Sequence, residues 1–228
     1  TTHLYAFHWD ARHFTLTPDP ANPIELTNIT YGATDLSLNG DILYVSDFSY
    51  GPIGFEEVVH AYDLNDDYAY MGDTQMGDNA VSIDYNALDE VIYAGAFDDN
   101  PNENCHLSKS MPGNSDPNAA TVKNIGANVI GVESDDETGL VYVTTYRDYS
   151  CTIEVYDTSN WENDPNVSAF PIFTYDNNNS DGVILSGLAG LVIGGPYKPS
   201  LLGLTKSDGL GVNECVEPDA TITYTICY

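Results

Sequence analysis

Short apolar runs recur along the chain, and each of them follows a turn. Four share one pattern: ILYVSDF at 42–48, VIYAGAF at 91–97, LVYVTTY at 140–146 and GLVIGGP at 190–196. Tyr44, Tyr93 and Tyr142 are each 49 residues apart, and Ile193 follows the last of them by 51. A weaker copy, HLYAFHW, covers residues 3–9. Repetition at such a period is typical of folds built from one repeated supersecondary unit.

Further strand-like segments flank each run. A polar–apolar alternation and a turn precede it, as in TDLSLNGD at 34–41 and VSIDYNALDE at 81–90. A third strand follows after a loop: EVVHAYDL at 57–64, NCHLSKS at 104–110, CTIEVYDT at 151–158 and SLLGLTK at 200–206. A fourth follows in several units: YAYMGDT at 68–74, ATVKNIG at 120–126 and FPIFTYD at 170–176. Each unit therefore predicts about four antiparallel strands, with the apolar run as an inner strand.

A four-stranded meander cannot bury both of its faces, but meanders stacked around an axis can. The sequence therefore predicts an all-β chain, a β-propeller of about five four-stranded blades. A β-sandwich is the alternative, because its strands also recur at short spacing. We expect the propeller to cover residues 1–206, with units near 1–33, 34–80, 81–129, 130–181 and 182–206.

The segment ATITYTICY at 220–228 alternates Thr with Ile or Tyr and predicts a strand within a C-terminal extension, residues 207–228. The first unit lacks its opening strand. The C-terminal strand can close the ring there, complete the fifth unit, or be exchanged with a neighbouring subunit.

The LYV-type strands over residues 3–206 resemble the YVTN-like propeller repeats of prokaryotic surface proteins. The segment LTKSDGLGVNECVEPDATITYTICY at 204–228 resembles the opening of the Ig-like conserved repeat domain of large bacterial and archaeal surface proteins. Asp219 follows Pro218 where that family has glycine, and the sequence stops where the family domain continues. The resemblance implies a structural and adhesive role and carries no catalytic residues.

The balance of charged residues limits the classes of molecule that the protein can bind. Six Lys and Arg stand against 35 Asp and Glu, a net charge of -29. This balance excludes a nucleic-acid-backbone binder, and no segment is apolar enough to span a membrane. A halophilic surface, a cation-binding extracellular surface and an acidic habitat each account for the charge, which keeps copies apart unless it is screened.

Four cysteines, Cys105, Cys151, Cys215 and Cys227, form no Cys-x-x-Cys pair, which disfavours a zinc ribbon. We expect a disulfide between Cys215 and Cys227 across a hairpin and one between Cys105 and Cys151 across successive units. Unpaired buried thiols are the alternative.

Three sequons begin at Asn28, Asn166 and Asn178. Together with the cysteines they favour an extracellular or cell-surface protein with Asn-linked glycans.

The turn with Asp63, Asn65 and Asp67 supplies oxygens of the kind that calcium prefers, and we expect a weak cation site there. A solvated acidic turn is the alternative, because Tyr68 and Thr74 stand where a calcium loop needs glycine and glutamate.

Histidine side chains are also potential metal ligands. Those at 3, 8 and 13 recur every five residues, and we expect most of them at the surface. His60 and His106 lie in corresponding third strands and predict a structural repeat position.

We therefore expect a non-enzymatic structural subunit of a cell-surface layer or extracellular filament, which self-assembles through β-strands and propeller surfaces. The first alternative is an adhesin or carbohydrate-binding propeller, and the second is a propeller lyase or glycosidase. The chain has no Gly-x-Ser-x-Gly elbow and no Gly-rich phosphate loop.

Overall fold

The computed structural model describes residues 2–10, 13, 15–30, 32–47, 58–97, 106–147, 150–161 and 168–175, all within one compact unit, Thr1–Ile193. The predictions for Cys105, Cys215, Cys227, Asn166 and Asn178, and for the segments at 190–196, 200–206 and 220–228, lie outside these residues.

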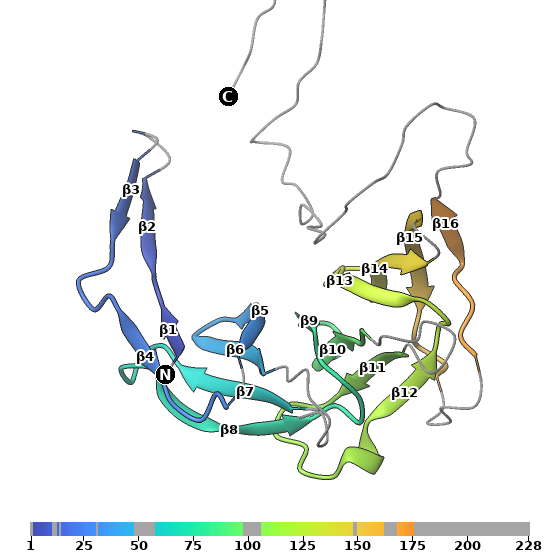
Figure 1. Ribbon diagram of the computed structural model, residues 1–228, viewed down its shortest axis with the longest axis horizontal. Coiled ribbons are helices and arrows are strands. Elements are labelled where there is room, and N and C mark those ends of the chain that lie inside the picture. Colours follow the sequence, from blue (N-terminus) through green and yellow to red (C-terminus); the bar gives the residue numbers. More distant parts are fainter. Residues whose placement is uncertain are drawn as a thin grey trace, which may run out of the picture. The chain divides into compact units, whose positions relative to one another are not determined.

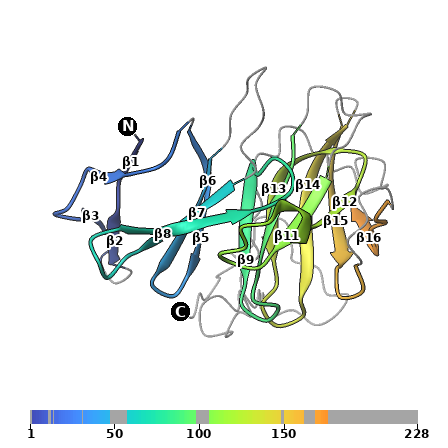
Figure 2. The ribbon, with the colours of Figure 1, turned by 90° about the horizontal axis from the view of Figure 1, so that it is seen from below.

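Three four-stranded antiparallel sheets follow one another along the described chain, each with its strands in sequence order (Figure 1). Sheet I contains β5 (Ala33–Asn39), β6 (Ile42–Asp47), β7 (Val58–Asp63) and β8 (Ala69–Gln75). Sheet II contains β9 (Ser82–Asn86), β10 (Val91–Gly95), β11 (His106–Ser110) and β12 (Thr121–Asn124). Sheet III contains β13 (Asn128–Ser134), β14 (Leu140–Arg147), β15 (Ser150–Asp157) and β16 (Phe173–Tyr175). The strands of sheets II and III are seen lengthwise in Figure 2.

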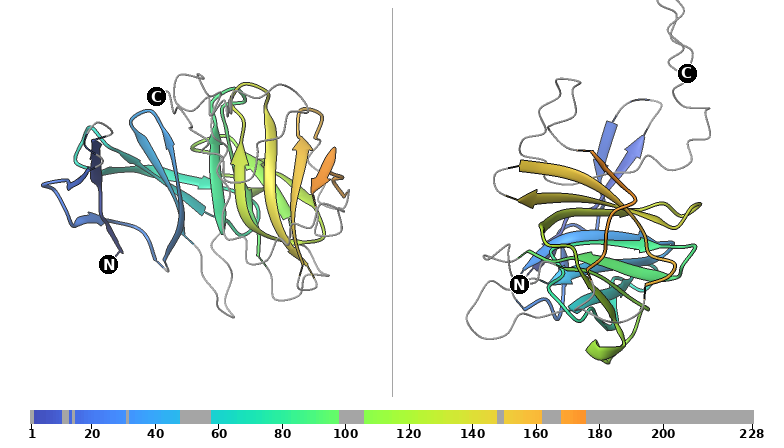
Figure 3. Two further views of the ribbon diagram at one scale, coloured as in Figure 1. Left: turned by 90° about the horizontal axis from the view of Figure 1, so that it is seen from above. Right: turned by 90° about the vertical axis from the view of Figure 1, so that its right-hand side faces the viewer.

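Residues 2–10 and 15–26 contain two two-stranded sheets, blue in Figure 3. In one, β1 (Thr2–Leu4) pairs with β4 (Ile24–Leu26), and in the other β2 (Phe7–Asp10) pairs with β3 (Thr15–Pro18). The weaker repeat copy at 3–9 is divided between β1 and β2, with Tyr5 and Ala6 between the two strands. The Asn22 side chain accepts from the Ala6 amide at 2.7 Å and donates to the Ala6 carbonyl at 2.6 Å, which takes the place of a strand partner there.

The apolar runs form the second strand of each sheet, where a strand lies on either side of them. Ile92, Tyr93 and Ala94 of β10 are fully buried. Between successive sheets the first strands contact one another, β5 against β9 and β9 against β13, and the apolar runs pack there as well, β6 against β9 and β10 against β13. Each apolar run among the described residues is thus an inner strand of its sheet, as predicted.

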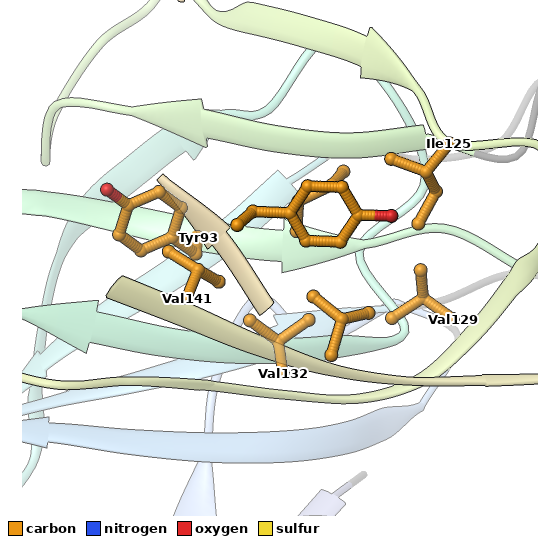
Figure 4. Close-up of a cluster of buried hydrophobic side chains, with 8 residues drawn as sticks. Tyr93, Ile125, Val129, Val132 and Val141 are labelled. Carbon is orange, nitrogen blue, oxygen red and sulfur yellow. The ribbon is translucent and has the colours of Figure 1, made fainter. Parts of the chain in front are cut away.

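Side chains from facing sheets form continuous cores. Between sheets II and III, Tyr93 packs with Ile125, Val129, Val132 and Val141 (Figure 4). Gly95 lies at this interface, where a Cβ would come within 2.0 Å of the Val129 side chain. A second cluster joins sheets I and II, and a third joins sheet I to β4.

Successive four-stranded meanders that pack face to face, first strand against first strand, are the blades of a β-propeller. The predicted all-β propeller fold is confirmed, with three full blades among the described residues. The described residues contain one short helical turn, η1 (Pro117–Ala119). No helix in this part of the chain has the length and apolarity to cross a bilayer.

Candidate functional site

The predicted cation site lies in the exposed turn between β7 and β8. The Asp63 carboxylate accepts a hydrogen bond from the Asn65 amide at 2.8 Å, and Asp67 has a positive φ of 50°. These contacts are those of an Asx turn. Within the described ranges, no three His, Cys, Asp or Glu side chains come together in a way that could hold a metal ion. The calcium site stays a prediction.

His8 and His13 each pair with a different aspartate. His8 lies 3.0 Å from Asp19, and His13 lies 2.6 Å from Asp10, all on or beside the β2–β3 hairpin. The structure therefore does not bring these histidines together.

Cys151 and Asn28 are the predicted modification sites within the described residues. Cys151 is buried in β15 opposite Tyr146 and forms no disulfide with any described residue. Asn28 is exposed in the segment between β4 and β5, as is Thr30, which completes its sequon. Glycosylation and the disulfides stay predictions.

Polar side chains of β5 link sheet I to sheet II. The Asp35 carboxylate accepts from the Ser82 hydroxyl at 2.6 Å and from the Ile83 amide at 3.0 Å. Two residues on, the Ser37 hydroxyl accepts from the Tyr85 amide at 2.9 Å and donates to Asp84 at 3.0 Å. Side chains of one first strand thus bind backbone amides of the next.

The same arrangement repeats between sheets II and III. The Ser82 hydroxyl accepts from the Val132 amide at 3.0 Å. The Asp84 carboxylate accepts from the amide and the hydroxyl of Ser134, at 2.7 and 2.5 Å. Burial raises the pKa of Asp84 above its ordinary value, although the hydrogen bonds from Ser134 and Ser37 oppose the rise. We call the hydrogen bonds made by Asp35, Ser37, Ser82 and Asp84 the inter-sheet links.

On the opposite face of β5, two apolar side chains are exposed. Leu36 is 45% exposed and Leu38 is 61% exposed, although both belong to a strand at a sheet interface. A pocket of about 350 Å³ lies beside them, between the β1–β4 pair and the start of β5. Its lining comprises Thr2, His3, Leu4, Leu26, Ala33, Thr34, Asp35 and Leu36. An apolar strand face beside a pocket is a feature of interaction sites.

A buried histidine lies between two carboxylates in sheet I. His60 of β7 is 3% exposed; its Nδ1 lies 2.6 Å from Asp73 on β8 and its Nε2 lies 3.3 Å from Asp47 on β6. Tyr70 donates its hydroxyl to the same Asp73 oxygen at 2.5 Å. The chain of polar groups therefore runs from an exposed carboxylate to one that is fully buried.

This network also holds the segment between β4 and β5. The Asp47 carboxylate accepts from the amides of Thr30 and Gly32, at 2.5 and 2.8 Å. The Tyr62 hydroxyl donates to the Thr27 carbonyl. Tyr62 is fully buried, and burial raises its pKa. These contacts fix the entry of the chain into β5 and give the network a structural role.

His60 and His106 are not equivalent, contrary to the prediction from the sequence. His60 pairs with Val45, whereas His106 lies two residues before Ser108, which pairs with the matching Ala94. His106 instead contacts Asp78. The two strands correspond, but the position that matches His60 is Ser108, two residues after His106.

The sequence contained a signal for the inter-sheet links that pattern analysis missed. The first strands contain Asp-Leu-Ser at 35–37 and Ser-Ile-Asp at 82–84, which put hydroxyl and carboxylate groups on one side of each strand. Such alternation is also typical of a strand with one face in solvent. Only the structure shows that in these strands the polar face contacts the next sheet.

Comparison with known proteins adds no family. No protein-family model matches the chain, and no curated protein matches it. Among solved structures, the chain is similar to the Cps50 (Swd1) β-propeller domain of Myceliophteria thermophila, with 11% identity and a TM-score of 0.46. The match covers 73% of this chain and 46% of that one, so the chain spans less than half the length of the propeller that it matches.

Proposed function

We propose that this protein is a non-enzymatic structural subunit of a cell-surface layer or extracellular filament, and that it self-assembles. The observation that carries the proposal is the open face of β5, where Leu36 and Leu38 are exposed beside a pocket. A repeat unit that polymerises needs such a face for its neighbour, and exposed apolar patches mark interaction sites.

Two features of the sequence support an extracellular setting. The strands resemble YVTN-like repeats of prokaryotic surface proteins, and residues 204–228 resemble the opening of an Ig-like repeat of surface proteins. The sequon at Asn28 is exposed and is available to a glycan if the protein is secreted.

The inter-sheet links suit this role. They join the sheets through side chains that are partly or fully buried, including Ser37, Ser82 and Asp84. Sheets fixed in this way form a stiff unit, and a stiff unit transmits load between neighbours in a layer or filament.

Light scattering after size exclusion, with negative-stain microscopy of the same fractions, tests the proposal on the full chain. The net charge of -29 keeps copies apart at low ionic strength. We expect monomers at low salt and ordered assemblies once salt or calcium screens the charge. A monomer at every salt and calcium concentration would contradict the proposal.

A carbohydrate-binding propeller is the second candidate, because Tyr5, just before β2, and Phe7 of β2 are more than half exposed. Exposed aromatic rings stack on sugars. A glycan array that gives a hit lost in Tyr5→Ala favours this candidate, and an array without hits counts against it.

A further inference from the structure

Corresponding positions in the three first strands follow from their pairing with the second strands. Ser37 pairs with Tyr44 and Asp84 pairs with Tyr93, so Ser37 and Asp84 correspond. By the same registers, Leu36 corresponds to Ile83 and Val132, and Leu38 corresponds to Tyr85 and Ser134. In each first strand, two of these six residues lie on the face directed toward the preceding sheet.

In sheets II and III this face is covered. Ile83 and Val132 are each 2% exposed. Their amides donate to Asp35 and Ser82, which belong to the first strand of the preceding sheet. The rule is that a first strand with hydroxyl or carboxylate side chains at two alternate positions covers the next sheet.

In sheet I the residues of β5 at these positions are exposed. Leu36 is 45% exposed, against 2% for the corresponding Ile83. The Leu36 amide donates to the carboxylate of its own neighbour, Asp35, at 2.9 Å. The preceding sheet contributes β1 and β4 to this interface, and the pocket lies between them and β5.

We infer that this open face is the acceptor site for a β-strand from a second copy of the chain, supplied by residues 221–225. The inference rests on the proposed function and deepens it, because it names the surface through which the subunits join. The donor strand adds to the β1 side of the pocket and covers Leu36 and Leu38.

The sequence of the donor fits the rule. Residues 221–225 read Thr-Ile-Thr-Tyr-Thr, and β9 reads Ser-Ile-Asp-Tyr-Asn at 82–86. Thr221 and Thr223 match Ser82 and Asp84, the residues whose side chains accept amides from the next sheet. In the donated strand the Thr221 hydroxyl replaces Asp35 as the acceptor of the Leu36 amide, and the Thr223 hydroxyl accepts from the Leu38 amide. A Thr hydroxyl has two acceptor lone pairs and suits this role.

Two kinds of variant test the two sides of the junction in the full chain. Leu38→Asp places a charge on the acceptor face, and Thr223→Pro removes a strand amide from the donor. Met71→Asp on β8 is the matched control, because Met71 is 54% exposed and the change in charge is the same. We expect each of the first two variants to lose species larger than a monomer at high salt, and the control to assemble as the natural protein does. Circular dichroism establishes that Leu38→Asp is folded, and Thr223→Pro leaves sheet I untouched.

Mixing the two deficient variants gives the sharpest result. A Thr223→Pro copy still accepts a strand and a Leu38→Asp copy still donates one, so the mixture forms one junction and stops at a dimer. Hydrogen exchange of the dimer, with the Thr223→Pro copy isotopically labelled, should protect its Leu36 and Leu38 amides at least tenfold.

The outcomes separate the two ideas. A natural protein that stays monomeric at all salt concentrations contradicts the proposed function itself. A natural protein that assembles, with Leu38→Asp assembling equally well, overturns only the acceptor site. A monomeric natural protein whose Leu36 and Leu38 amides lose protection in Thr223→Pro also overturns the inference, because the strand then closes its own chain.

Discussion

The hydroxyl of Ser37 on β5 donates to the carboxylate of Asp84 on β9 at 3.0 Å, so a hydrogen bond joins two sheets whose residues are 47 apart in sequence. Asp84 in turn accepts from Ser134 on β13. One carboxylate therefore connects three successive blades. Its removal leaves buried donors without partners on both sides.

Asp84→Ala should destabilise the protein by about 2–3 kcal/mol, because each unsatisfied buried donor costs about 1–3 kcal/mol. Chemical denaturation monitored by circular dichroism measures the change. Asp66→Ala, in the exposed turn after β7, is the control and should change stability by less than about 0.5 kcal/mol. Equal effects of the two substitutions would mean that the link between blades contributes little.

Gly95→Ala should disrupt the packing of sheet II on sheet III. A Cβ at Gly95 would lie 2.0 Å from the Val129 side chain and 2.9 Å from that of Val132. Overpacking of this kind costs about 1–3 kcal/mol or more. Gly32→Ala meets nothing within 4 Å and is the matched control. Thermal melting of both variants checks the prediction, which fails if Gly95→Ala melts at the natural temperature.

His60→Ala should destabilise the fold by about 1.5–3 kcal/mol, because the fully buried Asp47 carboxylate loses the imidazole beside it and keeps the amides of Thr30 and Gly32. The segment held by Asp47, at Thr30 and Gly32, should lose protection in hydrogen exchange. His13→Ala removes an exposed pair with Asp10 and should be within about 0.5 kcal/mol of the natural protein. Unchanged exchange at Gly32 in His60→Ala would rule out the anchoring role.

Alkaline pH should weaken the fold through Tyr70. Burial, together with the hydrogen bond to Asp73, raises the pKa of Tyr70 from 10.0 to about 12. The folded chain therefore keeps a proton that the unfolded chain releases, so this contribution to stability is complete below pH 10 and is lost as the pH rises toward about 12. Melting temperatures across this range should fall more steeply for the natural protein than for Tyr70→Phe. Parallel curves would contradict the assignment.

The strand pattern of the described blades could be predicted from the sequence because each apolar run is buried in the middle of a sheet. The run at 42–48 became β6 (Ile42–Asp47), and the run at 91–97 became β10 (Val91–Gly95). The division of residues 3–9 into two strands could not be predicted. It depends on the Asn22 side chain, 16 residues away from Ala6, which replaces a strand partner.

The candidate site was hidden for a related reason. Leu36 and Leu38 alternate with polar residues as in any half-buried strand, and only comparison with the buried Ile83 and Val132 shows that their face of β5 is exposed. The non-equivalence of His60 and His106 was hidden likewise. It depends on which residues of the second and third strands pair with each other, and the sequence spacing does not determine that pairing.

The inter-sheet links use backbone amides on the donor side, at Ile83, Tyr85, Val132 and Ser134. Every amino acid except proline provides such an amide, whatever its side chain. Mutation can therefore change these four residues during evolution without loss of the bond that docks one repeat on the next. The copies can therefore diverge at these amide positions as long as the preceding strand keeps its two short polar side chains.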